Sequence, residues 1–393
     1  MKMLQIFRDF IGTSETRSIK SSDPWLYAMF GGQRTNGHMV NPTTAEQLST
    51  VLACVQTTAN GISALPNYVF RKSANGREIA HDHALSRMIL EGPNDKQTWP
   101  DYMEWLVASI LLRGNGLSEI VSDRRGKLLE LRPIPWDHVA VNQSPTGQLT
   151  YDIPNRFFVD GRSTGTRRLL QSEVLHIRDR SDDGLIGRSR ISRASGVIGG
   201  ALTLQSFTHD LYGKNLNPSG ILSSSHKLKP EAAETIRQKW QGKFGIEGDG
   251  GIAVLDGDWS FQKMSINPED AELLAARRFT TEELARIFQV PPPLVGIWDH
   301  SSFTNSETAG RWFAQHTLQP LIRKIEAAFH KSLFTATERE SMCVEIDLSG
   351  FMRGDYAARW SAHKIAVDAG ILTVDEVREI EGWGPLTSTE GAG

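Results

Sequence analysis

The sequence predicts an α+β protein of two or three domains, in which two long helices flank a small insert. The chain has 393 residues, 39% of them hydrophobic, and this length accommodates more than one domain. Helical and strand-like patterns alternate between residues 43 and 180, as in an α+β domain. Two long helical patterns follow over residues 187–215 and 267–290, separated by a short mixed stretch.

The bulk composition argues against several classes of protein. A net charge of −3 argues against a protein that grips phosphates with a large cationic surface, but it does not exclude DNA as a partner. Cys54 and Cys343 lie far apart, so we expect neither a disulfide framework nor a zinc site, and a reducing compartment is favoured. The chain has no long apolar run and no signal-peptide pattern, so we expect no membrane partner.

The N-terminal part is predicted to be unstructured at first and then helical. Residues 1–42 are polar and weakly patterned, which is typical of a mobile arm. A first helix is expected to begin at Thr43, which has capping-box spacing with Glu46, and to end before Pro66.

Residues 43–186 are predicted to form one α+β domain. A strand is expected over residues 67–72, with a turn at Asn75-Gly76. A second amphipathic helix is centred on residues 101–115, and alternating runs around Asp123–Gly126 are typical of a hairpin.

Residues 187–215 are predicted to form one long helix that contains Gly196, Gly199 and Gly200. Each glycine lowers helix stability by about 1 kcal/mol relative to Ala. A helix that accepts this cost usually needs another group to approach its backbone closely. Two interpretations stay open: a tight crossing inside one subunit, or packing against a second copy of the chain.

The insert over residues 216–266 is predicted to contain a strand, a short helix, and a hairpin that turns at Asp256-Gly257. Its positive and negative charges balance. The second long helix follows over residues 267–290, with Asn267 as the expected N-cap and Pro268 at the first helical position.

A run of three prolines ends the second long helix and opens a loop over residues 291–305. Each proline fixes φ near −65°, so we expect a rigid exit, and Gly296 then allows the loop to turn. Residues 306–354 are predicted to form a long helix kinked at Pro320 and a return strand. Helices are expected over residues 355–383 and a disordered tail over 384–393.

No motif in the chain predicts an active site. Gly161–Gly165 matches the Gly-x-Ser-x-Gly pattern of hydrolases, but a strand-like run follows it, so Ser163 is expected in a hairpin turn. Gly245–Gly251 runs from a helix to a strand, the reverse of a phosphate-binding loop, and we expect a flexible loop there.

Two clusters of ionisable residues are expected to be structural. His81, Asp82 and His83 have no further ligand cluster nearby, so a solvated helix start is favoured over a metal site. Asp182 and Asp183 precede a glycine and are expected in a turn. We therefore expect no catalytic residue, no metal ion and no cofactor, as in a scaffold protein.

Eight segments occur in a fixed order along the chain and carry a resemblance to a known family. They are VLACVQTTANGISALP, LEGPNDKQTWPDYMEWLVASILLRGNG, RGKLLELRPIPWDHV, EVLHIRDRSDDGLIGRSRIS, NPSGIL, INPEDAELLAARRFTTEELARIFQVPPPLVG, FTNSETAGRWFAQHTLQPLIRKIE and GILTVDEVREIEG. With these segments, residues 43–382 resemble the portal proteins of tailed phages, of the long-tailed siphovirus type. Each segment alone is weak evidence for this family, whereas the content and order of all eight together are specific for it.

The resemblance implies a portal fold, assembled as a cyclic ring, typically a dodecamer, around an axial channel. Each subunit of such a ring has a wing, a stem of two helices, a small α/β clip, a tunnel loop with a kinked long helix, and a helical crown. By position, the parts are the arm (1–42), wing (43–186), first stem helix (187–215), clip (216–266), second stem helix (267–290), tunnel loop (291–305), kinked helix with return strand (306–354), crown (355–383) and tail (384–393).

The resemblance also implies a function and partners. In such a ring, at one capsid vertex, the terminase large subunit docks on the clip and drives double-stranded DNA through the channel without sequence specificity. Head-tail adaptor proteins bind later, and the DNA leaves by the same route. The other implied partners are further copies of the chain and the major capsid or scaffold protein. The implied location is the virion, with assembly in the host cytoplasm.

Candidate site residues follow from the same resemblance. The DNA-facing tunnel loop comprises Trp298, Asp299, His300, Ser301, Ser302, Phe303 and Thr304, and its hinge comprises Pro291, Pro292, Pro293 and Gly296. Stem packing is assigned to Gly196, Gly199 and Gly200, and docking on the clip to Lys239, Lys243, Asp256, Asp258 and Trp259. The loop contains no Lys or Arg, so we expect it to guide DNA without holding it, because each phosphate contact adds affinity.

The residues alone leave two other functions open. One is a soluble α+β enzyme with an unrecognised active site, and the other is a monomeric adaptor. Images of the purified protein would distinguish a ring from both alternatives.

Overall fold

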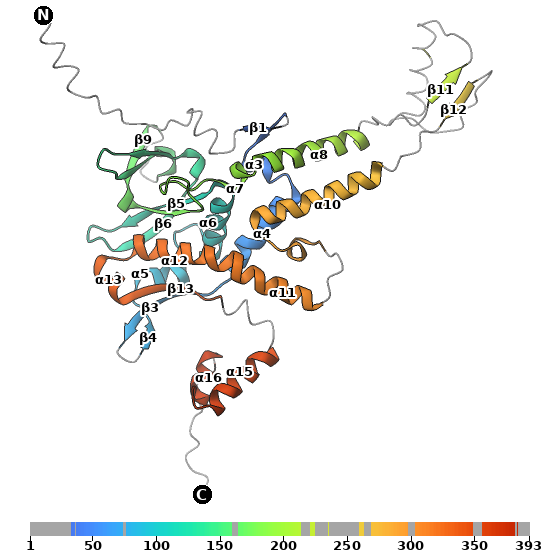
Figure 1. Ribbon diagram of the computed structural model, residues 1–393. Coiled ribbons are helices and arrows are strands. Elements are labelled where there is room, and N and C mark those ends of the chain that lie inside the picture. Colours follow the sequence, from blue (N-terminus) through green and yellow to red (C-terminus); the bar gives the residue numbers. More distant parts are fainter. Residues whose placement is uncertain are drawn as a thin grey trace, which may run out of the picture. The chain divides into compact units, whose positions relative to one another are not determined.

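The computed structural model describes residues 33–35, 37–73, 76–158, 164–213, 221–224, 235, 259–262, 269–297, 303–348, 356–381 and 383. These residues form two units (Figure 1). The larger unit comprises Ala53–Arg190 and the described part of Ala285–Gly393, and the smaller unit comprises the described parts of Gly31–Leu52 and Ile191–Leu284. The secondary structure is mixed α+β, as the sequence predicts.

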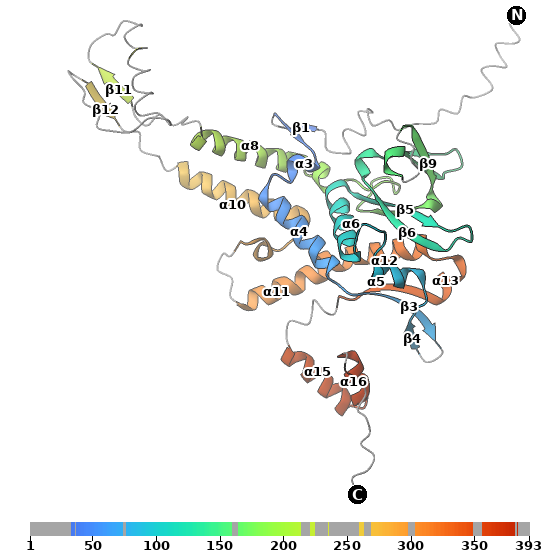
Figure 2. The ribbon, with the colours of Figure 1, turned by 180° about the vertical axis from the view of Figure 1, so that it is seen from behind.

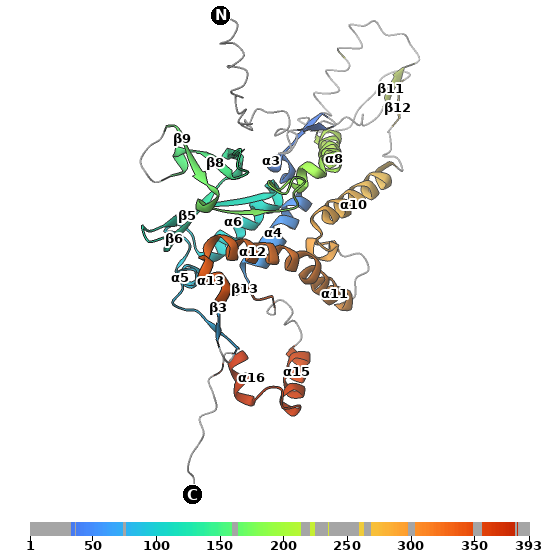
Figure 3. The same ribbon diagram turned by 60° about the vertical axis from the view of Figure 1, so that its left-hand side comes forward.

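Antiparallel three-stranded sheets form the β part of the larger unit (Figure 3). In sheet order, the strands are β13 (Met342–Ile346), β3 (Asn67–Ser73) and β4 (Gly76–Ile79); β10 (Val174–Arg178), β5 (Asn115–Ser122) and β6 (Leu128–Ile134); and β7 (Ala140–Gln143), β8 (Leu149–Pro154) and β9 (Thr166–Leu170). The predicted hairpin around Asp123–Gly126 is confirmed, because β5 pairs with β6. The return strand is also confirmed, because β13 pairs with β3 from a distant part of the sequence.

One hydrophobic core lies under the two sheets that contain β5 and β8. Alternate residues of β8 are buried, as expected when one face of a strand covers a core. Two large side chains fill this core, Tyr151 from β8 and Trp136 from the 3₁₀ helix η1 (Trp136–His138). Two further 3₁₀ turns, η2 (Asn155–Phe157) and η3 (Gln171–Glu173), connect strands at its edge.

Four helices pack around these sheets: α5 (Ala84–Glu91), α6 (Trp99–Arg113), α12 (Gln319–Leu333) and α13 (Ala336–Ser341). The predicted amphipathic helix is confirmed as α6, which Thr98 and Asp101 cap in a capping box. Gly114, at φ +76°, ends it in the left-handed conformation. α12 contacts both β10 and β13, and so joins two of the sheets (Figure 1).

The smaller unit contains an ordered hairpin within the part predicted to be a mobile arm. β1 (Gln33–Thr35) pairs with β2 (His38–Val40), and both strands contact helix α8 (Ser195–Gly213). Gly37 has φ +83°, and Val40 is fully buried. The prediction of a mobile arm is therefore wrong for residues 33–35 and 37–42. The sequence Asn36-Gly37 is typical of a two-residue hairpin turn. The polar composition of the surrounding residues favoured a mobile arm and so concealed this indication.

Two predicted helices are each interrupted. The first is divided into α3 (Pro42–Ala45) and α4 (Ser49–Ser63), and the capping box joins Asn41 to Thr44 in place of Thr43 and Glu46. The helix predicted over residues 187–215 is divided into α7 (Arg190–Arg193) and α8. The side chain of Arg190 is held by Asp179, whereas α8 packs against the β1–β2 hairpin, so different partners fix the two pieces.

The described parts of the remaining elements lie where the sequence predicts them, whereas the turn predicted at Asp256-Gly257 and all of the predicted short helix except Thr235 lie outside the described residues. β11 (Ile221–Ser224) pairs with β12 (Trp259–Gln262) in the insert, and α10 (Glu269–Phe288) is the second long helix. α8 and α10 run side by side (Figure 2). α15 (Tyr356–Asp368) and α16 (Val374–Ile380) are the C-terminal helices, and the predicted tail lies outside the described residues. Among the described residues, no helix is long and apolar enough to cross a membrane.

Candidate functional site

The exit of helix α10 has an unusual backbone conformation. The helix ends at Phe288, and Gln289 follows with φ +60°, the one positive φ among the described non-glycine residues. The Val290 amide donates to the Ala285 carbonyl at 3.0 Å, which closes the last turn as in a helix that ends with a left-handed residue. Glycine usually occupies this position, because a side chain there is strained. The surrounding structure therefore fixes the direction in which the chain leaves α10.

The three prolines and Gly296 form one rigid turn after this exit. Val290 is buried, and Pro291 is extended at φ −59° and ψ 136°. The 3₁₀ turn η4 (Pro292–Val295) follows and ends at Gly296, whose φ of +84° is left-handed. The predicted backbone conformations of these residues are confirmed, whereas their role as a hinge stays a prediction.

A partly buried charge cluster holds the last carbonyl of α10. Arg190 Nη1 donates to the Phe288 carbonyl at 3.2 Å, and Arg190 Nε donates to Asp179 Oδ2 at 2.8 Å. Lys324 Nζ from α12 lies 3.3 Å from Asp179 Oδ1. Burial raises the pKa of Asp179, but the charge and hydrogen bond of Arg190 and the charge of Lys324 outweigh it and lower the pKa below its usual value. Asp179 is therefore ionised and binds both cations.

A second contact holds the next residue of the exit. The Thr317 hydroxyl donates a hydrogen bond to the Gln289 carbonyl. Thr317 belongs to a π-helical segment, η5 (Ala314–Leu318), between α11 (Phe303–Phe313) and α12. Pro320 lies at the start of α12 and cannot donate to the preceding turn, so the predicted interruption takes the form of a π segment just before this proline.

A polar network positions the segment that carries Arg190. Asn115 Nδ2 donates to the Gly187 carbonyl at 2.7 Å, and Asn115 Oδ1 accepts from the Gly187 amide at 2.8 Å and from His176 Nε2 at 3.0 Å. The Tyr151 hydroxyl donates to His176 Nδ1 at 3.0 Å. Burial lowers the pKa of His176 to about 3, so its imidazole is neutral. The sequence reasoning did not single out these residues.

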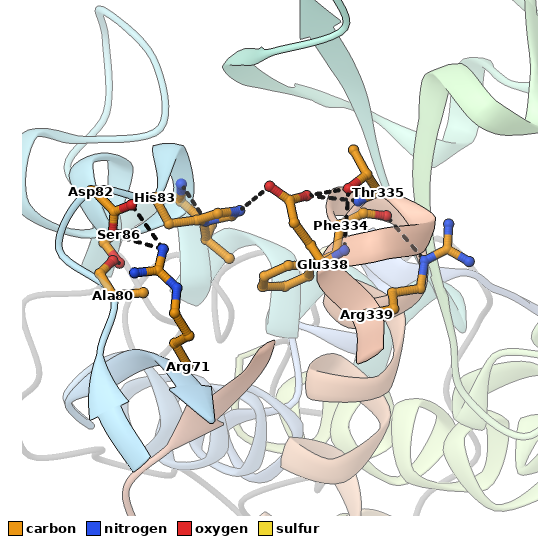
Figure 4. A network of polar contacts seen from close by, with 10 residues as sticks. Arg71, Ala80, Asp82, His83, Ser86, Phe334, Thr335, Glu338 and Arg339 are labelled. Atoms are coloured by element: carbon orange, nitrogen blue, oxygen red, sulfur yellow. Dashed lines mark hydrogen bonds and ion pairs between the residues drawn. The ribbon is translucent and has the colours of Figure 1, made fainter. Parts of the chain in front are cut away.

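The His81–His83 cluster is a helix start, as expected, although His83 itself is buried and not solvated (Figure 4). His83 Nδ1 accepts from the Leu85 amide at 3.2 Å and so caps α5. Its ring stacks on Phe334, with centroids 4.8 Å apart, and its Nε2 lies 3.7 Å from Glu338 Oε1. Asp82 pairs with Arg71. Among the described residues, no group of His, Cys, Asp and Glu could hold a metal ion.

The turn expected at Asp182 and Asp183 agrees with the sequence. Asp183 Oδ1 accepts from the Leu185 and Ile186 amides at 2.7 and 3.0 Å, which is a local turn and not a carboxylate dyad. The turn expected at Ser163 lies outside the described residues, but the strand β9 follows Gly165, where a nucleophile elbow would have a helix.

Comparison with known proteins assigns the chain to a family. A sequence model described as "Phage portal protein" matches residues 49–382. The chain belongs to the phage portal protein family. The portal protein of Enterobacteria phage HK97 is 26% identical over 352 residues, which cover 88% of this chain and 81% of that protein. The probable portal protein of Streptomyces phage phiC31 is 27% identical, covering 95% of this chain and 82% of that protein.

Solved structures show the same fold. A chain in the neck of an empty gene transfer agent particle, computed with C6 symmetry, has a TM-score of 0.60 at 22% identity, covering 93% of this chain and 94% of that one. An HK97-family phage portal protein from Corynebacterium diphtheriae has a TM-score of 0.53 at 14% identity, covering 81% of this chain and 99% of that one. Membership of the family makes the chain a phage portal protein, which forms the ring at a capsid vertex for DNA packaging and ejection.

The portal residues predicted from the sequence are only partly described by the structure. Trp298–Ser302 of the tunnel loop lie outside the described residues. Phe303 and Thr304 are the first residues of α11, so the helix begins earlier than the predicted Ser306. Of the clip candidates, Trp259 lies on β12, and the remaining four, Lys239, Lys243, Asp256 and Asp258, lie outside the described residues.

The three stem glycines have different surroundings. A Cβ at Gly199 would lie 2.8 Å from the Thr35 Cβ, so β1 already occupies the space beside it. This contact favours the crossing within one subunit at Gly199, and packing of Gly199 between subunits stays a prediction. Gly196 and Gly200 have no atom within 4 Å of an added Cβ, and their packing against another copy stays a prediction.

Proposed function

We propose that this portal subunit assembles as a dodecamer and presents its tunnel loop, residues 291–305, to double-stranded DNA in the channel. The solved neck of a native gene transfer agent particle, computed with C12 symmetry, has a chain with a TM-score of 0.59 at 21% identity, covering 95% of this chain and 98% of that one. Because a repeated heterologous contact closes into a ring, each subunit would present its loop at the same height.

The other parts take the roles expected of a portal subunit. α8 and α10 form the stem, residues 216–266 form the clip, α15 and α16 form the crown, and the sheets of the larger unit form the wing. The clip binds the terminase large subunit during packaging and the head-tail adaptor afterwards. The wing contacts the major capsid or scaffold protein, and assembly takes place in the host cytoplasm.

The observation that carries this proposal is the double anchoring of the α10 exit. Arg190 binds the Phe288 carbonyl, and Thr317 binds the Gln289 carbonyl. The prolines then leave the chain little freedom. A loop that follows a helix end held in this way takes the same position in every subunit. Its sequence, IWDHSSFTN, carries no cation, so DNA would slide past it.

Asp299→Lys tests the contact with DNA. The substitution adds one cation per subunit at the same height of the ring, and each phosphate contact steepens the salt dependence of affinity by a slope of about 0.9. We expect packaging to slow or stall, most strongly at low salt, in an assay of nuclease-protected DNA per capsid. Asp299→Asn, which removes the charge without adding a cation, is the matched control. Packaging at the normal rate by Asp299→Lys rings would show that the loop does not face DNA.

A further inference from the structure

One imidazole of the larger unit lies between the starts of two helices (Figure 4). His83 is the N-cap of α5, and its Nδ1 accepts from the Leu85 amide at 3.2 Å. On the other side of the ring, Nε2 lies 3.7 Å from Oε1 of Glu338, which is in the first turn of α13. Because Nδ1 accepts a hydrogen bond, the neutral ring carries its proton on Nε2, and this proton faces the carboxylate.

The surroundings of His83 fix this geometry. The imidazole is buried and stacks on the ring of Phe334, with the two centroids 4.8 Å apart. Glu338 is held in place because its Oε2 accepts from the Thr335 amide and hydroxyl at 2.9 and 2.8 Å. Its Oε1 is then directed toward the imidazole, as Figure 4 shows. The imidazole therefore has two fixed neighbours, a backbone donor at α5 and a carboxylate at α13.

The ionisable groups that face His83 or its stacking partner are Glu338 on α13, Arg71 on β3, His330 on α12, and Asp82 beside it in sequence. Asp82 and Arg71 form an ion pair at 2.8 Å, so their opposite charges partly cancel at His83. His330 lies against Phe334, with ring centroids 5.7 Å apart, and its Nε2 donates to a backbone carbonyl of α13 at 3.2 Å. Glu338 is thus the group that a charge on His83 would engage.

We propose that His83 is a pH-operated switch that caps α5 when it is neutral and pairs with Glu338 when it is protonated. An imidazolium has no acceptor, because both of its ring nitrogens carry protons. Protonation therefore ends the bond from the Leu85 amide and leaves α5 without its N-cap, while it strengthens the contact with the carboxylate. The dipole of α5 also opposes a positive charge at the start of the helix. The switch lies within one subunit and depends on neither the dodecamer nor the tunnel loop.

The direction of the pH effect follows from the two groups of the switch. Burial lowers the pKa of His83 below its ordinary value of 6.5, so the stability that the neutral ring contributes is complete above pH 6.5 and declines as the pH falls toward the folded pKa. Burial raises the pKa of Glu338, but the hydrogen bonds from Thr335 outweigh it and hold the pKa below the usual value. The carboxylate is therefore still ionised when the imidazole gains its proton.

Hydrogen exchange of the full-length chain at pH 7.5 and pH 4.5, corrected for the intrinsic effect of pH, tests the switch. We expect the amides in the first turn of α5 to exchange about fivefold faster at the lower pH, as after loss of an N-cap, while α13 keeps its protection. His83→Asn should abolish this pH dependence, because Asn caps helices but does not titrate. His81→Asn, which removes an exposed imidazole, is the matched control and should behave as the unmodified chain.

A second variant tests the role of the carboxylate. Glu338→Gln can keep the bonds to Thr335, but it removes the charge that favours the imidazolium. We therefore expect the midpoint of the α5 transition to move to lower pH, a shift that a purely structural role of His83 would not produce.

The other outcomes would overturn the proposal. Exchange at α5 that does not respond to pH in the unmodified chain, or responds equally in His83→Asn, would show that His83 is not the switch. A pH dependence that His330→Gln abolishes and His83→Asn keeps would assign the effect to His330. An unchanged midpoint in Glu338→Gln would mean that the carboxylate does not receive the charge. Equal acceleration in α5, α13 and β8 would indicate unfolding of the whole unit in place of a local switch.

Discussion

Gln289 has a backbone conformation that glycine normally adopts, and this makes it sensitive to the shape of its side chain. At φ +60°, a β-branched residue clashes with its own backbone, whereas Asn and Gly are tolerated. We expect Gln289→Val to lower the free energy of unfolding by about 1–2 kcal/mol in urea titrations. Gln289→Asn is the matched control and should be nearly neutral. Equal stability of the Val and Asn variants would contradict the assigned conformation.

His176 makes the stability of the larger unit dependent on pH. Its folded pKa is about 3, whereas the unfolded pKa is near 6.5, so the unfolded state binds more protons between these values. The contribution of His176 is complete above pH 6.5 and is lost as the pH falls, by about 1.4 kcal/mol for each pH unit.

Unfolding titrations at pH 7 and pH 5 measure this effect. The slope with pH should be flatter in His176→Gln than in the unmodified chain. His81→Gln, which removes an exposed imidazole, is the matched control. An unchanged slope in His176→Gln would mean that another group is responsible.

At the scale of elements, the Asp179 cluster joins β10, α7, α12 and the end of α10. Asp179→Asn removes the charge that pairs with Arg190 and Lys324, and losing a hydrogen bond between charged groups typically costs about 1.5–3 kcal/mol. We expect this loss in urea titrations, together with faster hydrogen exchange at the last turn of α10. Asp182→Asn is the matched control, because the Asp182–Arg188 pair is more exposed and should contribute about 1 kcal/mol or less. Similar losses in both variants would contradict the anchoring role.

Local signals predicted many elements, and distant contacts account for most of the errors. The prolines and Gly296 specify their own backbone angles, and alternating patterns specify β5, β6 and β13. The left-handed Gln289 carries no such signal, because neighbouring contacts impose it. Likewise, only the fold brings Thr35 beside Gly199 or joins Asp179 to Lys324.

At the scale of the whole molecule, the ordered segments in the sequence predicted the portal family correctly. Individually weak segments were sufficient because their order reflects a complete fold, which the matches to portal proteins of HK97 and phiC31 confirm. The division into wing, stem, clip and crown stays a prediction. The tunnel loop over residues 291–305 stays a prediction, and the residues that hold the Phe288 and Gln289 carbonyls before it were not predicted from the sequence.

The central claim is that copies of this chain form a ring whose channel is lined by the tunnel loop. Electron cryomicroscopy of the purified full-length chain tests it most directly. We predict closed rings with an axial hole, in which residues 298–304 of every subunit lie at the narrowest point. Particles without a central channel, or rings in which these residues lie on the outer surface, would contradict it.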